Sequence, residues 1–220
     1  MPSALSPIAK RVIKRAAKPA AEESTARSRE LPEVRRLMLI EATTRSIAKY
    51  GYSGTTIERI CEEAGVSRGL INHHFGSKDE LILQSYRKLC DEWAYYTQDM
   101  MDGSLEPEDA IRATISKNFN PAMFKQEYLG IWLGFYSVIP KNPELKRLDR
   151  ALYKQDLTHF QTQFERLATK RKLKIDARLQ AIGLMALMEG LWLQWSLDPK
   201  SFSVDEAKAV CLGSIAHLLG

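Results

Sequence analysis

The segment between residues 57 and 75 carries the side chains with the clearest chemistry. Two short helices are predicted there, Ile57–Ala64 and Arg68 to about Phe75, joined by the tetrapeptide 64–67. Gly65 can adopt the left-handed turn between them, and Ser67 can cap the second helix while its hydroxyl contacts a phosphate. The pattern is typical of a helix-turn-helix, although an ordinary helical hairpin has the same general form.

The second of these helices presents short or polar groups, namely Arg68, Gly69, Asn72 and His73. A DNA major groove about 12 Å wide admits a helix with such side chains. Asn can form a bidentate contact with adenine or a single bond to phosphate. The segment therefore predicts sequence-specific binding to double-stranded DNA.

A second set of candidates is aromatic and lies in the C-terminal two thirds of the chain. Its members are Trp93, Tyr96, Trp132, Phe135, Tyr136 and Trp192. Aromatic side chains of this kind are candidate walls of a ligand-binding pocket. The alternative is that most of these rings are core residues at helical spacing. Glu189, inside an apolar helix, requires a partner: a cation from another subunit, a hydroxyl or a cationic ligand.

The elements that position these residues are predicted to be helices throughout, so the fold class is all-α. A helix follows Pro32 and stops near Tyr50 at Gly51, and Ser77 with Glu80 forms a capping-box pattern that opens a long helix. Longer, more apolar helices are predicted near Pro107–Asn118, Pro121–Ile139, Pro143–Lys172, Asp176–Ser196 and Val204–Leu219.

Three regions follow from this pattern. Residues 1–30 contain seven cations and three acids, and we expect a disordered basic arm, which is either a solvated tail or a segment that attracts DNA. Residues 31–80 form a three-helix DNA-binding domain with seven cations and seven acids. Residues 81–220 form a larger helical domain for ligand binding and dimerisation.

A homodimer is predicted from two helices. The helix 176–196 is apolar nearly all round, and Gly183, Ala186 and Gly190 would let another helix approach closely. Together with the striped helix 143–172, it suggests a four-helix interface. A two-fold dimer would place its reading helices about 34 Å apart and require a palindromic operator.

Several classes of protein are excluded by what the sequence lacks. It contains no nucleophile elbow, phosphate-binding glycine loop or zinc-ligand pair, so neither catalytic residues nor a metal site or cofactor is expected. Its three widely spaced cysteines suit a reducing cytoplasm. The N-terminus has no apolar signal-peptide core, and the most apolar run, 181–195, is too short and too polar for a membrane span.

The N-terminal region resembles the DNA-binding signature of TetR regulators. The matching residues are Gly51, Thr55, Thr56, Ile57, Ile60, Ala64, Gly65, Val66, Ser67, Gly69, His73, Phe75, Lys78 and Leu81. The resemblance implies that the third helix reads bases. Asn72 and His74 depart from the common pattern, which has Tyr at both positions; we expect His73 to face DNA and His74 to pack beside Phe75. The expected DNA contacts are Arg45, Thr55, Thr56, Ser67, Arg68, Gly69, Asn72, His73 and Lys78.

The C-terminal region is similar to the BetI-like branch of that family. The resemblance rests on the segments 132–136 and 189–193 and on the helix start at Asn142-Pro143. It implies a repressor that a small molecule releases from its operator, with a choline-like compound as the candidate effector. Binding would tilt the fourth helix and so shift the population of arrangements of the two DNA-reading helices. The alternatives are a different apolar or aromatic effector, or an architectural DNA-binding protein without a ligand. A cavity lined by the aromatic residues would favour the sensor.

Overall fold

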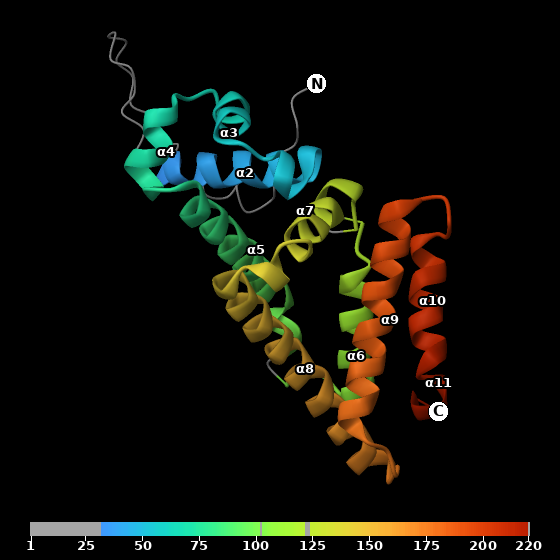
Figure 1. Cartoon of the computed structure of the whole chain (residues 1–220). Coiled ribbons are helices and arrows are strands. Elements are labelled where there is room, and N and C mark those ends of the chain that lie inside the picture. The colour runs from blue at the N-terminus through green and yellow to red at the C-terminus, as the bar shows by residue number, and fades with distance from the viewer. Residues whose placement is uncertain (1–31, 102, 122–123, 220) are drawn as a thin grey trace, which may run out of the picture. The chain divides into compact units, whose positions relative to one another are not determined.

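The computed structural model of this chain describes residues 32–101, 103–121 and 124–219, and every regular element in those ranges is helical (Figure 1). The helices are α2 (Pro32–Gly54), α3 (Ile57–Ala64), α4 (Arg68–Phe75), α5 (Lys78–Met101), α6 (Pro107–Asn118), α7 (Gln126–Tyr136), the 3-10 turn η1 (Ile139–Lys141), α8 (Pro143–Arg171), α9 (Ala177–Leu197), α10 (Val204–Ser214) and α11 (Ala216–Leu219). The prediction of an all-α fold is confirmed. The basic arm predicted for residues 1–30 lies outside the described residues.

Helices α2, α3 and α4 enclose a small core of their own. Leu39, Ile60 and Ile71 are fully buried in it, and Leu81 at the start of α5 completes it. Two turns depend on glycine: Gly51 has φ 68° where regular helical geometry in α2 is interrupted, and Gly65 has φ 67° at the end of α3. Both lie in the left-handed region that glycine adopts without steric cost.

Helix α5 leads from this small core into the rest of the chain (Figure 1). Its first turn contributes Leu81 to the core of α2–α4, while Tyr86 and Leu89 belong to a second core with α7 and α8. The helix runs without interruption across residue 80, where the sequence analysis places a domain border. A movement of α5 therefore involves both cores.

The predicted helix Pro121–Ile139 was too long at both ends, because α7 spans only Gln126–Tyr136. Pro140 cannot donate a backbone hydrogen bond and disfavours helical geometry in the residue before it, so a 3-10 turn follows instead. The predicted helix Val204–Leu219 is likewise divided at Ile215, between α10 and α11.

Helix α7 packs directly on the C-terminal half of α2 (Figure 1). Two glycines make this contact close. A Cβ atom on Gly134 would lie 2.4 Å from Cγ2 of Ile47, and one on Gly130 would lie 3.8 Å from the carbonyl oxygen of Ala48. The two helices consequently approach closely, with the Ile47 side chain of α2 seated against the α7 backbone at Gly134.

The long helix α8 turns its apolar stripe into its own subunit. Leu145, Phe164 and Leu167 are fully buried there against neighbouring helices of the same chain. The apolar stripe therefore cannot supply a dimer face, because it already has its packing partners within the chain; the part of helix 143–172 in a dimer stays a prediction. The exposed aliphatic side chains of the C-terminal helices lie on α9 and α10: Leu179, Leu193, Leu197 and Val210.

Candidate DNA-reading face and effector pocket

Helix α4 presents a polar outer face above a buried inner one. Ile71 and Phe75 point into the small core and are 0% and 7% exposed. Ser67, Arg68, Gly69, Asn72 and His73 are all exposed, and Gly69 has no neighbour within 4 Å of where its Cβ would lie. His74 is half-buried with its ring 6.5 Å from that of Phe75, the arrangement expected from the sequence. The outer face is thus open to a macromolecular partner.

Arg36 of α2 anchors this helix from behind, a role that the sequence analysis did not assign. Its guanidinium donates to the carbonyl of His74 and to the side chain of Gln84, and it lies 4.5 Å from the ring centroid of Phe75. One cation therefore ties the end of α4 to α2 and α5. Arg36 is committed to this internal role.

The two neighbouring threonines before α3 have different roles. Thr56 is the N-cap of α3 and accepts a hydrogen bond from the backbone N–H of Arg59 at 3.3 Å. Thr55 is fully buried, and its hydroxyl donates to the carbonyl of Gly51 at 2.8 Å. Thr55 is therefore not a DNA contact, contrary to the expectation, because its side chain holds the turn before α3.

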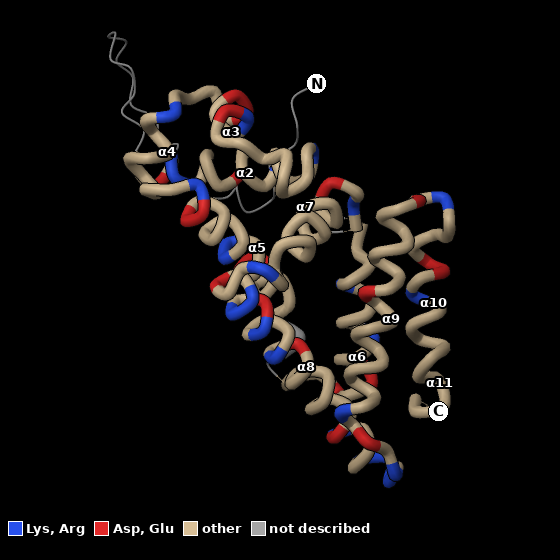
Figure 2. Tube along the Cα trace, viewed as in Figure 1, with Lys and Arg blue, Asp and Glu red and all other residues tan. Residues whose placement is uncertain are grey.

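The cations near the reading helix are already partnered with groups of the same region. Arg68 pairs with Glu58 at 2.9 Å, and Arg45 pairs with Glu63 at 2.7 Å. The ammonium of Lys78 lies 5.8 Å from the ring centroid of Tyr52. DNA phosphates would have to replace Glu58 and Glu63 as partners of these cations. Figure 2 shows the acidic positions grouped on α3, where they balance the charge of residues 31–80.

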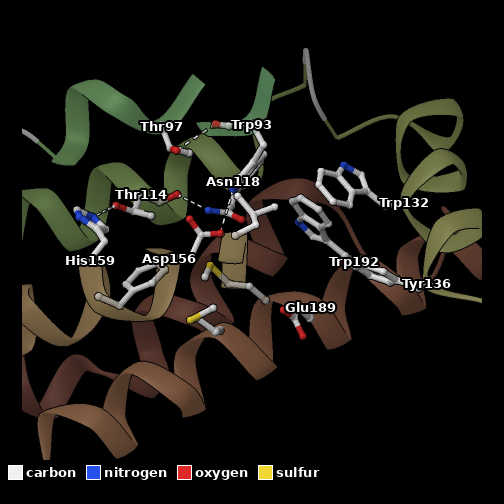
Figure 3. A pocket seen from close by; sticks show the side chains of 14 residues that line it. Trp93, Thr97, Thr114, Asn118, Trp132, Tyr136, Asp156, His159, Glu189 and Trp192 are labelled. Carbon is white, nitrogen blue, oxygen red and sulfur yellow. Dashed lines mark hydrogen bonds between the residues drawn. The ribbon is translucent and has the colours of Figure 1, made fainter. Parts of the chain in front are cut away.

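A pocket lies among α5, α6, α7, α8 and α9, with about 640 Å³ of empty space, part of it open to solvent. Its lining consists of Trp93, Thr97, Thr114, Asn118, Trp132, Tyr136, Leu152, Asp156, His159, Phe160, Met185, Met188, Glu189 and Trp192 (Figure 3). Trp93 meets Trp132 and Trp192 at interplanar angles of 82° and 89°. The Trp93 ring therefore packs edge-to-face against the other two, and all three indoles border the pocket.

Four of the six predicted aromatic residues come together at this pocket: Trp93, Trp132, Tyr136 and Trp192. The other two do not line it. Phe135 is fully buried on another face of α7, with its ring 4.7 Å from that of Tyr86, and Tyr96 donates its hydroxyl to the carbonyl of Lys117. Phe135 points away from the pocket because adjacent positions of a helix face different directions, while Tyr96 is held toward α6 by its hydrogen bond to Lys117.

Two carboxylates give the pocket its electrostatic character. The indole N–H of Trp93 donates to Oδ2 of Asp156 at 3.1 Å, and burial raises the pKa of Asp156 to about 6. Glu189 is exposed as a residue, and partial desolvation of its carboxyl beside the pocket, then the nearby charge of Asp149, raise its pKa. The lining contains no lysine or arginine, and neither carboxylate has an ion pair with a described residue. A cation would lower the cost of ionising both groups.

Comparison with known proteins finds matches for both the N-terminal and the C-terminal part of the chain. Residues 39–84 match the model for bacterial regulatory proteins of the tetR family, and residues 107–220 match the C-terminal domain of BetI-type transcriptional repressors. The chain belongs to the TetR family. The regulator BetI of Stenotrophomonas maltophilia is 34% identical over 83% of this chain and 91% of its own, and BetI 1 of Chromohalobacter salexigens is 36% identical over 84% and 91%.

Solved structures have the same fold. A regulator from Pseudomonas aeruginosa has a TM-score of 0.78 and 29% identity over 87% of this chain and 93% of its own. A regulator from Saccharomonospora viridis, solved in complex with choline, has a TM-score of 0.75 and 22% identity over 85% and 97%. This TetR-family chain is therefore a DNA-binding transcriptional regulator. Among its described residues, no helix is both long and apolar enough to cross a bilayer.

In this regulator α5 and α8 are joined by two matching hydrogen bonds. The hydroxyl of Tyr86 donates to Oδ1 of Asp149 at 2.8 Å, and Trp93 donates to Asp156 one heptad further along both helices. Both donors belong to the helix that leads to the small core, and the second acceptor lines the pocket. The pocket and α5 thus share a hydrogen-bonded carboxylate.

Asp156 is a pocket residue that was not predicted from the sequence. The signal was present, because Asp156 interrupts the otherwise apolar stripe of α8, and a charge at a core position requires a function or a partner. The pocket's neutral polar residues, Thr97, Thr114, Asn118 and His159, gave a weaker signal. They stand on helical faces whose burial depends on the packing of other elements.

Proposed function

We propose that this regulator is a repressor that a choline-like quaternary ammonium cation releases from a palindromic operator. The observation that carries the proposal is the pocket, where indole rings of Trp93, Trp132 and Trp192 surround a space bordered by Asp156 and Glu189. Ring faces attract a quaternary ammonium group that cannot donate strong hydrogen bonds, and the carboxylates neutralise its charge. The choline complex of the Saccharomonospora viridis regulator supports the same chemistry.

An aromatic cavity favours a sensor over an architectural DNA-binding protein, which needs no such space. The test compares choline with 3,3-dimethylbutan-1-ol, in which carbon replaces the charged nitrogen. We expect calorimetry to show heat with choline only, and fluorescence anisotropy of an operator fragment to show release with choline only. Absence of both effects with choline, or equal effects with the neutral compound, would reject the proposal.

The proposed reading face consists of Ser67, Arg68, Gly69, Asn72 and His73, with Thr56 and Lys78 beside the phosphate backbone. Its support is the exposure of these α4 residues and their anchoring through Arg36. Asn72→Ala should relax specificity at one base position and cost about 1–3 kcal/mol there. Selection from randomised DNA measures this change, and Tyr95→Ala, on the exposed side of α5, is the matched control.

The proposed dimer joins α9 and α10 to the same helices of a second copy. Leu179, Gly183, Ala186, Gly190, Leu193 and Leu197 are all exposed on α9 at intervals of four and three residues. This spacing is that of one continuous helix face, and its small residues allow close contact. Leu193→Glu should convert the dimer to a monomer in light scattering, while Tyr153→Glu on α8 should not.

The proposed release begins at the carboxylate that the pocket shares with α5. A cation beside Asp156 competes with the Trp93 hydrogen bond, and movement of Trp132 or Tyr136 displaces α7 against α2. Because α5 and α2 both hold α4, the reading helices of a dimer would change their separation. Tyr86→Phe, which removes the companion bond to Asp149, should change the choline concentration needed for operator release more than the choline affinity of the free protein.

A further inference from the structure

Helix α3 carries an excess of negative charge (Figure 2). Its acids are Glu58, Glu62 and Glu63, and Arg59 is its only cation. The first helix of a helix-turn-helix crosses the DNA backbone, where phosphates repel carboxylates. Acids at this place lower the affinity for DNA, so their contacts within the protein must be considered one by one.

Two of these acids form ion pairs that differ in exposure. Glu63 pairs with Arg45 of α2 at 2.7 Å, and the two side chains are 28% and 42% exposed. Glu58 pairs with Arg68 of α4 at 2.9 Å, and the two side chains are 60% and 66% exposed. The less exposed pair joins two helices of the small core, whereas an ion pair as exposed as the second contributes little to folding stability. The pair of Glu58 and Arg68 is therefore free to exchange with a group outside the protein.

The carboxylate of Glu58 lies among groups that are proposed above to contact DNA. Arg68 is the first residue of α4, and the N-terminal residues of a reading helix are those that meet base edges. Hydrogen bonds from the backbone N–H of Glu58 itself and from the Thr56 hydroxyl lower the pKa of this carboxyl. The positive charges of Arg68 and Lys78 lower it further. The partners of this carboxylate are thus also the expected partners of a DNA phosphate.

We propose that Glu58 is an internal competitor of DNA, whose carboxylate holds Arg68 until DNA replaces it, so that this exchange limits the affinity of the regulator for any duplex. The inference rests on the proposed reading face. The carboxylate has the sign of charge of a phosphate but belongs to the chain, so every binding event must displace it. Operator and random DNA are weakened by a similar factor, and more of the protein stays free of the many non-operator sites of a genome.

Glu58→Gln keeps the shape of the side chain and removes its charge. Glu62→Gln is the matched control, because it changes the net charge equally on the same helix, at an exposed residue without an ion pair to a described residue. Fluorescence anisotropy of the full chain compares an operator fragment selected from randomised DNA with a random duplex of equal length at several salt concentrations. We expect Glu58→Gln to bind both duplexes about fivefold more tightly per DNA-bound subunit, the upper range for an exposed ion pair.

The salt dependence gives a second readout of the same variant. In the wild type the displaced carboxylate stays close to the DNA and retains a counterion there. The slope of log affinity against log salt concentration should therefore be steeper by about one per subunit in Glu58→Gln, and little changed in Glu62→Gln. Circular dichroism establishes that both variants are folded.

Equal gains in the two variants would reveal an effect of net charge alone and overturn the inference. No gain in Glu58→Gln would overturn it as well, and so would a loss, since Glu58 would then orient Arg68 for DNA instead of withholding it. In an Arg68→Gln background the gain from Glu58→Gln should be smaller, and an undiminished gain contradicts exchange through Arg68. If Arg68→Gln and Asn72→Ala both bind the operator as the wild type does, the proposed reading face is rejected instead.

Discussion

The affinity of this regulator for a quaternary ammonium cation should depend on pH because of Asp156. Burial raises the pKa of this carboxyl to about 6, so the pocket loses a negative charge as the pH falls through that value. If binding requires the ionised form, about nine tenths of the protein is competent at pH 7 and about one tenth at pH 5. Choline affinity should therefore fall about tenfold between pH 7 and pH 5 and change little from pH 7 to 8.

Calorimetry of choline at pH 5, 6, 7 and 8 measures this dependence, with circular dichroism at each pH to establish that the protein is folded. Asp156→Asn is the matched control, because Asn keeps an acceptor for the Trp93 N–H but does not titrate. The choline affinity of this variant should be lower at pH 7 than that of the wild type and should vary less with pH. A smaller pH dependence should remain, because the pKa of Glu189 is also raised. A flat wild-type profile, or an unchanged slope in the variant, would refute the role of the Asp156 charge.

Three further outcomes are expected. Asp156→Asn should stabilise the unliganded protein at pH 7 by up to about 3 kcal/mol, measured by urea unfolding. The reason is that the pKa of Asp156 rises from 3.8 to about 6 on folding, so ionisation of this carboxyl at pH 7 opposes folding. No gain in stability would mean that the carboxylate is better solvated than its burial indicates. Gly134→Ala should destabilise the protein by about 1–3 kcal/mol, whereas Gly69→Ala should not, because only the former Cβ would meet Ile47. Deleting residues 2–30 should weaken binding to specific and random DNA alike and flatten its salt dependence, and an unchanged salt slope would contradict a role for the basic arm.

The helix-turn-helix could be predicted from the sequence because its determinants are local. Gly65 ends α3, Ser67 precedes α4, and both helix spans are observed with the expected bounds. Which side chains face outward was harder to predict. Thr55 and Thr56 are adjacent in a turn, and only the packing of the whole small core places Thr55 inside.

The pocket shows the same limit. Phe135 and Tyr136 are adjacent on α7, yet one completes the core beside Tyr86 and the other lines the pocket. The α8 stripe, similarly, predicts an apolar contact but does not identify the surface that it meets. Helix periodicity defines relative directions within one helix, while the partner of each face depends on contacts between residues distant in the sequence.

The close contact between α7 and α2 has a consequence for how this family member can change its effector. Gly130 and Gly134 contribute no side chain of their own to this contact, so the buried Ile47 side chain packs directly on the α7 backbone and little slack remains to absorb a displacement. Substitutions of Trp132 or Tyr136 that alter the resting tilt of α7 would therefore also alter the position of α2 before any effector binds. A change of ligand specificity through α7 would therefore also change how much operator is bound without effector. New specificities should arise more readily from the opposite wall on α9, which does not make the close contact with α2.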